Sequence, residues 1–211
     1  MPVFKSGKGQ ALDWCELEFF EIVELNPGDT HVFERESEKE KLIVGNGVCQ
    51  LRFDGQVVEA EVKTKAELVG GGGQFEVANV TEATTLVRMC GHWGEELGGL
   101  GIFQAGPNDN RNGGGDPVDY EKDTAFDSHF HDCDEYWIFF EGRGIAVSEG
   151  KHYEVGPGDC LATGMGWHHD FAKVQESIEA VYFETTMEGK KRRGHLWDYE
   201  HGKAQPQLDR V

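Results

Sequence analysis

Two histidines that lie two residues apart, His129 and His131, constrain this chain more than any other feature of its sequence. Side chains at positions i and i+2 of an extended strand point to the same face, so both imidazoles can reach one point. Glu135 follows, and the aromatic and β-branched run at 136–140 predicts a buried strand, with a glycine turn expected at 142–144. Imidazole and carboxylate together suit borderline transition metals. The stretch therefore predicts a metal site on a β-sheet.

A fourth ligand is expected downstream, where residues 156–169 read GPGDCLATGMGWHH. This stretch holds a PGD turn, a short apolar run, a second glycine turn and two adjacent histidines. Either His168 or His169 can supply the ligand, and the spacing favours His169.

The two stretches together resemble the motifs of the cupin superfamily, G-x5-HxH-x3,4-E-x6-G and G-x5-PxG-x2-H-x3-N. The resemblance implies a jelly-roll β-barrel and a three-histidine, one-glutamate site for one divalent transition metal (Zn, Mn, Fe, Ni, Co or Cu). Three positions depart from the motifs, but they belong to turns and framework rather than to the ligand set. The matching residues are His129, His131, Glu135, Gly142, Gly158, Gly166 and His169, and the departures are Asp123, Gly164 and Lys173.

Composition narrows the function classes. The net charge of −19 argues against nucleic acid or an anionic membrane as a partner, because both require a basic surface. No apolar run approaches the ~20 residues of a membrane-spanning helix, and the N-terminus lacks the apolar core of a secretory signal. Five scattered cysteines without a CxxC pair predict reduced thiols and a cytoplasmic protein.

The rest of the chain predicts short strands between Gly, Pro and Asp turns, which indicates an all-β protein. An offset of 97 residues places GNG at 45–47 on GRG at 142–144, and EATTLVRM at 82–89 on EAVYFETT at 179–186. This self-similarity predicts two tandem cupin-like halves, a bicupin arrangement. We expect a degenerate half at 15–103, a linker at 104–123, a metal-binding half at 124–188 and a tail at 189–211.

The N-terminal half is predicted to hold no metal. At the same offset its ligand positions are Val32, Glu34, Glu38 and Gly72, the last within the glycine run 70–73. A borderline metal would not prefer such a set over three histidines. The charged run ERESEKEK at 34–41 is expected to be a solvated loop or edge.

Three further segments carry expectations. Residues 91–103 are rich in glycine and are interpreted as a loop across a barrel mouth. The basic cluster at 190–193 is read as a solvated turn, with contact to an anionic substrate group as the alternative. Trp197 and Tyr199 are expected to anchor the tail.

Open coordination positions and nearby aromatic side chains favour a small organic substrate as the partner. The first hypothesis is a metal-dependent isomerase, epimerase or lyase acting on a sugar or on a hydroxy or keto acid. The alternatives are a non-haem metal dioxygenase and a sugar-binding protein without turnover, and homodimerisation is left open. Candidate acid or base residues are Tyr136, Glu184 and His168. Trp137 and Phe139 are expected to share the inward face with Glu135.

Overall fold

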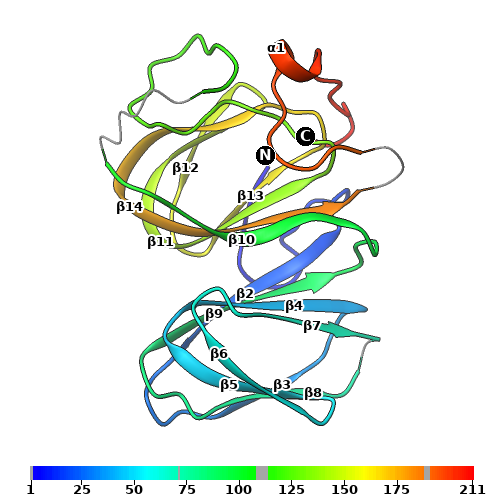
Figure 1. Cartoon of the computed structure of the whole chain (residues 1–211), viewed down its shortest axis with the longest axis vertical. Helices are drawn as coiled ribbons and strands as arrows, with labels where there is room; N and C mark the ends of the chain where they lie inside the picture. Colours follow the sequence, from blue (N-terminus) through cyan, green and yellow to red (C-terminus); the bar gives the residue numbers. More distant parts are fainter. Residues whose placement is uncertain (1, 71, 108–113, 188–190) are drawn as a thin grey trace. The chain divides into compact units, whose positions relative to one another are not determined.

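The structure is a computed structural model that describes residues 2–70, 72–107, 114–187 and 191–211. The described residues form fourteen β-strands and one short helix, which confirms the predicted all-β class (Figure 1). They divide into two compact units. Unit 1 comprises the chain up to Lys5, Leu12–Cys15 and the chain from Gly94 onward, whereas unit 2 comprises Ser6–Ala11 and Glu16–Trp93. No helix among the described residues is long and apolar enough to cross a membrane.

Unit 1 is built on one six-stranded antiparallel sheet in the order β1-β13-β11-β14-β10, with β12 paired to β11. The two long strands, β11 and β14, curve strongly and carry most of the pairing (Figure 1). Alternate inward side chains, among them Trp137, Phe139 and Phe171, form its apolar core. The elements are β1 (Val3–Lys5), β10 (Leu97–Ala105), β11 (Glu135–Ser148), β12 (Lys151–Val155), β13 (Asp159–Thr163), β14 (His169–Thr186) and α1 (Asp198–His201).

The predicted turn at 142–144 is wrong, because β11 continues through it to Ser148. The register between β11 and β14 shifts repeatedly between Phe139 and Ala146, as expected for β-bulges. Gly142 has a φ of 79°, and a Cβ atom there would lie 2.0 Å from the carbonyl oxygen of Ser177. The glycines therefore let a single long strand bend rather than end.

Unit 2 consists of two four-stranded sheets, β2-β9-β4-β7 and β3-β8-β5-β6. Their inner faces share a core that includes Leu42, Leu51, Phe75, Val77 and Leu86. The strands are β2 (Leu17–Leu25), β3 (His31–Glu34), β4 (Lys39–Asn46), β5 (Val48–Phe53), β6 (Gln56–Glu61), β7 (Lys65–Val69), β8 (Gln74–Ala78) and β9 (Thr84–Gly91).

The Asp-Gly pair at 54–55 forms a β-hairpin turn. Asp54 and Gly55 have φ values of 49° and 73°, as a two-residue hairpin between β5 and β6 requires. In unit 1, Glu149 and Gly150 join β11 to β12 with φ values of 55° and 70°. Both units thus contain a two-residue turn with positive φ at both positions, while the tandem-barrel arrangement itself stays a prediction.

The charged run at 34–41 is not a solvated loop. Strand β4 begins within it at Lys39, and both Lys39 and Glu40 are buried. Glu40 is tolerated in the interior because Arg88 of β9 donates two hydrogen bonds to its carboxylate, at 2.8 and 3.0 Å. Val32 and Glu34 of β3 are exposed, and so are Glu38 and Gly72 outside it. The predicted lack of a metal in this half stays a prediction. Residue 71 of the glycine run lies outside the described residues.

The interpretation of 91–103 as a loop is also wrong, since Leu97–Ala105 forms β10 at the edge of the unit 1 sheet. Residues 94–103 therefore belong to unit 1 rather than to the N-terminal half. The proposed linker at 104–123 overlaps the end of β10, and its residues 108–113 lie outside the described part of the chain. All five cysteines are buried and unbonded, in agreement with the predicted reduced thiols.

Candidate metal centre

Four ligand-type side chains meet where strands β11 and β14 begin. Nε2 of His129 lies 3.1 Å from Nε2 of His131. Oε2 of Glu135 lies 3.2 Å from Nε2 of His131 and 2.6 Å from Nε2 of His169. All four side chains are buried. The structure thus brings the four predicted ligands together and places His169, not His168, among them.

The arrangement of these atoms fits a cation better than a network of hydrogen bonds. Oε2 of Glu135 and Nε2 of His169 are both buried, yet their geometry makes no hydrogen bond to each other or to any other described group. Buried polar atoms without partners are rare, and buried charges are normally paired or bound to metals. The buried His/Glu cluster therefore indicates a metal site, while the identity and number of the ions stay predictions.

Backbone carbonyl groups hold the three imidazoles in the orientation that a metal requires. Each histidine donates its outer ring N–H to the main chain, which leaves Nε2 free to face the centre. The accepting carbonyl oxygens belong to Asp127 for His129 (2.9 Å), Gly194 for His131 and Trp167 for His169 (3.4 Å).

Burial and neighbouring charges set the protonation states of the cluster. Burial, followed by the nearby imidazoles, lowers the pKa of His129 well below its usual value, which favours the neutral ring that binds metals. Burial by itself would raise the pKa of Glu135, but the imidazoles of His131 and His169 outweigh it and hold that pKa well below the usual range. Burial by itself would lower the pKa of His131, but the Glu135 carboxylate outweighs it and raises that pKa. The site therefore offers an ionised carboxylate at Glu135 and favours a neutral imidazole at His129.

Comparison with known proteins agrees with this geometry. No family model matches the chain. The uncharacterised protein y4oW of Sinorhizobium fredii is 43% identical over 212 residues, which cover the whole chain and 97% of that relative, so the two belong to one family. Among solved structures, AerE from Microcystis aeruginosa matches with a TM-score of 0.55 at 8% identity, over 80% of this chain and 87% of AerE. A cupin 2 conserved barrel domain protein from Leptotrichia buccalis matches with a TM-score of 0.41 at 10% identity, over 79% of this chain and 83% of that one.

The ligand residues of both sequence motifs meet in one cluster on the unit 1 sheet. The chain has the all-β fold that its resemblance to the cupin superfamily implies. The solved structures share this fold at low sequence identity, so the chemistry of the site follows from the residues of this chain.

A cavity of about 350 Å³ opens beside the candidate metal centre. Its walls are mostly aromatic and include Trp137, as the alternation from Glu135 predicts, while Phe139 lies deeper in the apolar core. Its polar lining includes two of the expected ligands, so a small molecule in the cavity can reach the ion. The lining residues are Phe103, Phe126, His129, Glu135, Trp137, Tyr182, Glu184, Gly194 and His195.

Only one of the three candidate acid or base residues lines this cavity. Glu184 of β14 does so and pairs across the sheet with Glu135. Tyr136 is fully buried on the other face of β11, near Cys15 and Phe183. His168 belongs to a different cluster with Asp116.

The glycines of β10 make room for the cavity lining. A Cβ atom at Gly98 would lie 2.6 Å from Oε2 of Glu184, and one at Gly101 would lie 2.6 Å from the hydroxyl oxygen of Tyr182. Real Cβ atoms do not approach so closely. Glycine is therefore needed at these positions of the edge strand β10, because the side chains of Glu184 and Tyr182 lie across it. The same glycines had indicated a loop in the sequence.

His195 is a site residue that sequence reasoning missed. Its ring stacks on His129 with the centroids 3.6 Å apart and 5° between the planes. Its Nδ1 donates to Asp127 (2.9 Å), and the same carboxylate accepts a hydrogen bond from Nε1 of Trp197 (2.9 Å). Trp197 therefore anchors the tail as predicted, whereas Tyr199 is 66% exposed and only stacks on it.

The basic residues before His195 bind the protein itself. Arg192 donates to Asp132 (3.0 Å), and Arg193 donates to Glu96 (3.2 Å) and to the carbonyl oxygen of Gly98 (3.2 Å). Arg192 and Arg193 are exposed but also contact the protein, so the prediction of a solvated turn describes them only in part. Lys190 of the predicted cluster lies outside the described residues.

Zinc is expected to raise the melting temperature of the protein substantially. A ligand that binds only the folded state at about 1,000 times its Kd stabilises by about 4 kcal/mol. For a chain of this size that corresponds to roughly 8–16 °C. Calorimetry with excess Zn²⁺ and with EDTA measures the shift; superimposable transitions would contradict a metal site that forms on folding.

Proposed function

We propose that this protein is a metal-dependent enzyme that acts on a small polar organic substrate, a sugar or a hydroxy or keto acid, in the cavity beside His129 and Glu135. The observation that carries the proposal is the position of Glu184. Its carboxyl group faces the same cavity and is not one of the four side chains of the ligand cluster, although it lies within 4.8 Å of the ligating atoms of His131 and Cys133. A second carboxyl group beside a metal centre is the arrangement that acid or base chemistry needs.

The ion and the aromatic side chains of the cavity are assigned different roles in the reaction. A bound divalent ion would supply Lewis acidity toward substrate oxygen atoms. Phe103, Phe126 and Trp137 form a packed aromatic wall, with ring centroids 5.2 to 5.4 Å apart, against which the apolar face of a substrate can pack. This wall also excludes water from the reacting atoms.

Glu184 is assigned the transfer of a proton. Burial, followed by the nearby Glu135 carboxylate, raises the pKa of Glu184 above its usual value. A carboxyl group of raised pKa can accept a proton from a substrate carbon or hydroxyl group and return it at a neighbouring atom, as isomerisation, epimerisation and elimination all require. Its Oε2 atom lies against the backbone of Gly98, which limits its movement.

Glu184→Gln is expected to lower kcat by about 100- to 10,000-fold without loss of bound metal, since it removes the acid–base group but no ligand. Turnover is measured with the metal-loaded protein on a panel of sugars and of hydroxy and keto acids. Glu176→Gln, at an exposed position of the same strand, is the matched control and is expected to keep full activity.

Two results would overturn this assignment. One is consumption of oxygen in step with turnover, which would establish dioxygenase chemistry instead. The other is an unchanged kcat in Glu184→Gln. Tight ligand binding without turnover across the panel would identify a binding protein.

A further inference from the structure

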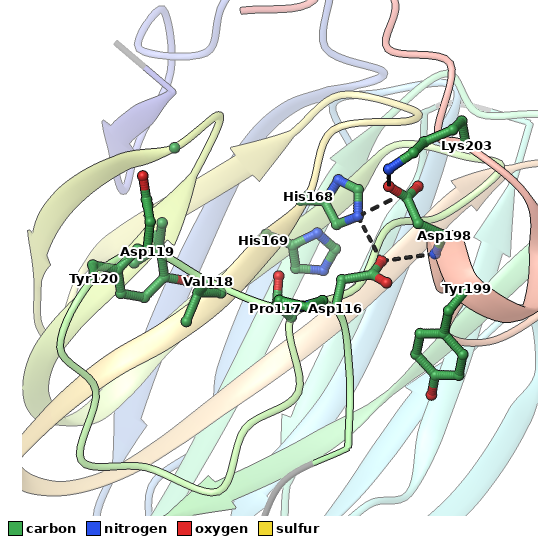
Figure 2. Close-up of a pocket in the computed structure, with 13 residues that line it drawn as sticks. Asp116, Pro117, Val118, Asp119, Tyr120, His168, His169, Asp198, Tyr199 and Lys203 are labelled. Atoms are coloured by element: carbon green, nitrogen blue, oxygen red, sulfur yellow. Dashed lines mark hydrogen bonds and ion pairs between the residues drawn. The ribbon is translucent and has the colours of Figure 1, made fainter.

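A second group of ligating side chains lies in a larger cavity of about 690 Å³ on unit 1 (Figure 2). His168 and His169 are consecutive residues, and consecutive side chains of extended backbone point to opposite faces. His169 joins the metal centre and also lines this cavity, whereas His168 belongs to a second cluster within the cavity. The cavity wall comes from the loop at 116–120, the start of β14 and the segment around α1.

Three segments that are far apart in the sequence bring one ligand each. Nε2 of His168 lies 2.8 Å from Oδ2 of Asp116 and 3.9 Å from Oδ1 of Asp198 (Figure 2). The ligating atoms of all three side chains lie within 4.8 Å of one another. The two measured separations, 2.8 and 3.9 Å, fall within the ~4.4 Å that two donors can span when each lies about 2.0–2.2 Å from a shared ion.

Asp116 gives independent evidence for a missing partner. Its side chain is only 8% exposed, and its Oδ1 atom is buried without a hydrogen bond. Its Oδ2 atom accepts from the backbone N–H of Asp198 (2.8 Å) as well as facing His168. Lys203, the one ammonium group in the cavity lining, is engaged with Oδ2 of Asp198 at 2.6 Å. A buried carboxylate without a cationic partner is costly unless it binds a proton or a metal.

We propose that Asp116, His168 and Asp198 bind a second divalent transition-metal ion. One imidazole and two carboxylates form a borderline ligand set that suits zinc or manganese. The wide cavity leaves room for water on the remaining coordination positions. Because Asp198 begins α1, the ion would fix the start of this helix to the barrel, close to the segment that holds His131 through Gly194. The competing explanation is a simple ion pair between Asp116 and a protonated His168.

Zinc stoichiometry separates the two explanations. The metal-free full-length chain is dialysed against Zn²⁺ at neutral pH, and bound zinc is measured by mass spectrometry. The wild type is expected to bind about two equivalents, and His168→Gln about one. His92→Gln is the matched control, because His92 is an exposed histidine of unit 2 paired with Glu18, and it is expected to retain both equivalents.

Two further variants show which site loses zinc and whether the loss seen in His168→Gln comes from misfolding. Asp116→Asn is expected to lose the same equivalent as His168→Gln. His131→Ala is expected to lose the other, and combining it with His168→Gln leaves none. One equivalent in the wild type, or two in both His168→Gln and Asp116→Asn, would overturn the proposal.

Discussion

Replacing His131 by alanine is expected to remove most of the metal from the centre formed by His129, His131, Glu135 and His169. His131 contributes one of four donor atoms, and its Nε2 lies 3.1 Å from Nε2 of His129 and 3.2 Å from Oε2 of Glu135. Loss of a residue that merely supports a ligand lowers metal affinity by about 10- to 100-fold, so loss of the ligand itself is expected to exceed 100-fold. Competition with a chromogenic chelator measures the change at a fixed pH.

Glu38→Ala provides the control, because Glu38 is the counterpart of a ligand position in the predicted repeat. Glu38 is exposed on unit 2, and the ligand cluster is made without it. Its removal is expected to leave zinc affinity unchanged. Equal affinity in the two variants, or a greater loss in Glu38→Ala, would reverse the assignment of the active half. Because the second proposed site contains neither residue, a chelator titration that resolves two affinities tests each site separately.

The ligand set could be predicted from the sequence because each part of it depends on local geometry. The two-residue spacing of His129 and His131 follows from strand alternation alone, and Glu135 comes from the next strand with only a short connection between them. His169 required the second motif, since an isolated antiparallel bridge between His129 and His169 places it opposite the first one. The same alternation predicted the inward direction of Trp137.

The support of the site could not be predicted because it depends on contacts between distant segments. His195 reaches His129 from the tail, and no local periodicity marks such a residue. The glycines of β10 indicated a loop, because nothing in the sequence shows that Glu184 and Tyr182 lie across Gly98 and Gly101. Gly142 was read as a turn for a similar reason: a bulge in a long strand and a turn both favour positive φ.

The charged run at 34–41 of unit 2 could not be interpreted from the sequence either, because the burial of Glu40 depends on a distant residue, Arg88. Arg88 and Glu40 are 48 positions apart, and each alone predicts a solvated residue. In the structure Arg88 is 2% exposed, and its guanidinium group also lies 5.3 to 5.9 Å from the rings of Phe19, Phe33 and Phe75. Part of the interior of unit 2 is therefore filled by an ion pair instead of apolar side chains. Arg88 binds both carboxylate oxygens of Glu40 and packs against aromatic rings.

Arg88→Met is expected to destabilise unit 2 by about 3–5 kcal/mol, because it leaves the fully buried Glu40 carboxylate without its cation. Urea denaturation followed by circular dichroism measures the loss. Glu21 also accepts a hydrogen bond from Arg88 (2.9 Å), but its side chain is 36% exposed. Glu21→Gln is therefore the matched control, with an expected cost of at most about 1 kcal/mol.

The double variant Arg88→Met, Glu40→Leu tests why Arg88→Met loses stability. The cause is either the missing ion pair itself or the Glu40 carboxylate that is left buried without a partner. Replacing both members by apolar side chains removes the unpaired carboxylate, so the double variant is expected to be more stable than Arg88→Met alone. A double variant as unstable as the sum of both single variants would mean that the pair is needed for packing and for its hydrogen bonds to the backbone. Glu40 accepts such a bond from the N–H of Glu36 (2.6 Å), and Arg88 donates one to the carbonyl oxygen of Glu34 (2.6 Å). In that case the interior of unit 2 would be specified by its polar network as much as by its apolar core.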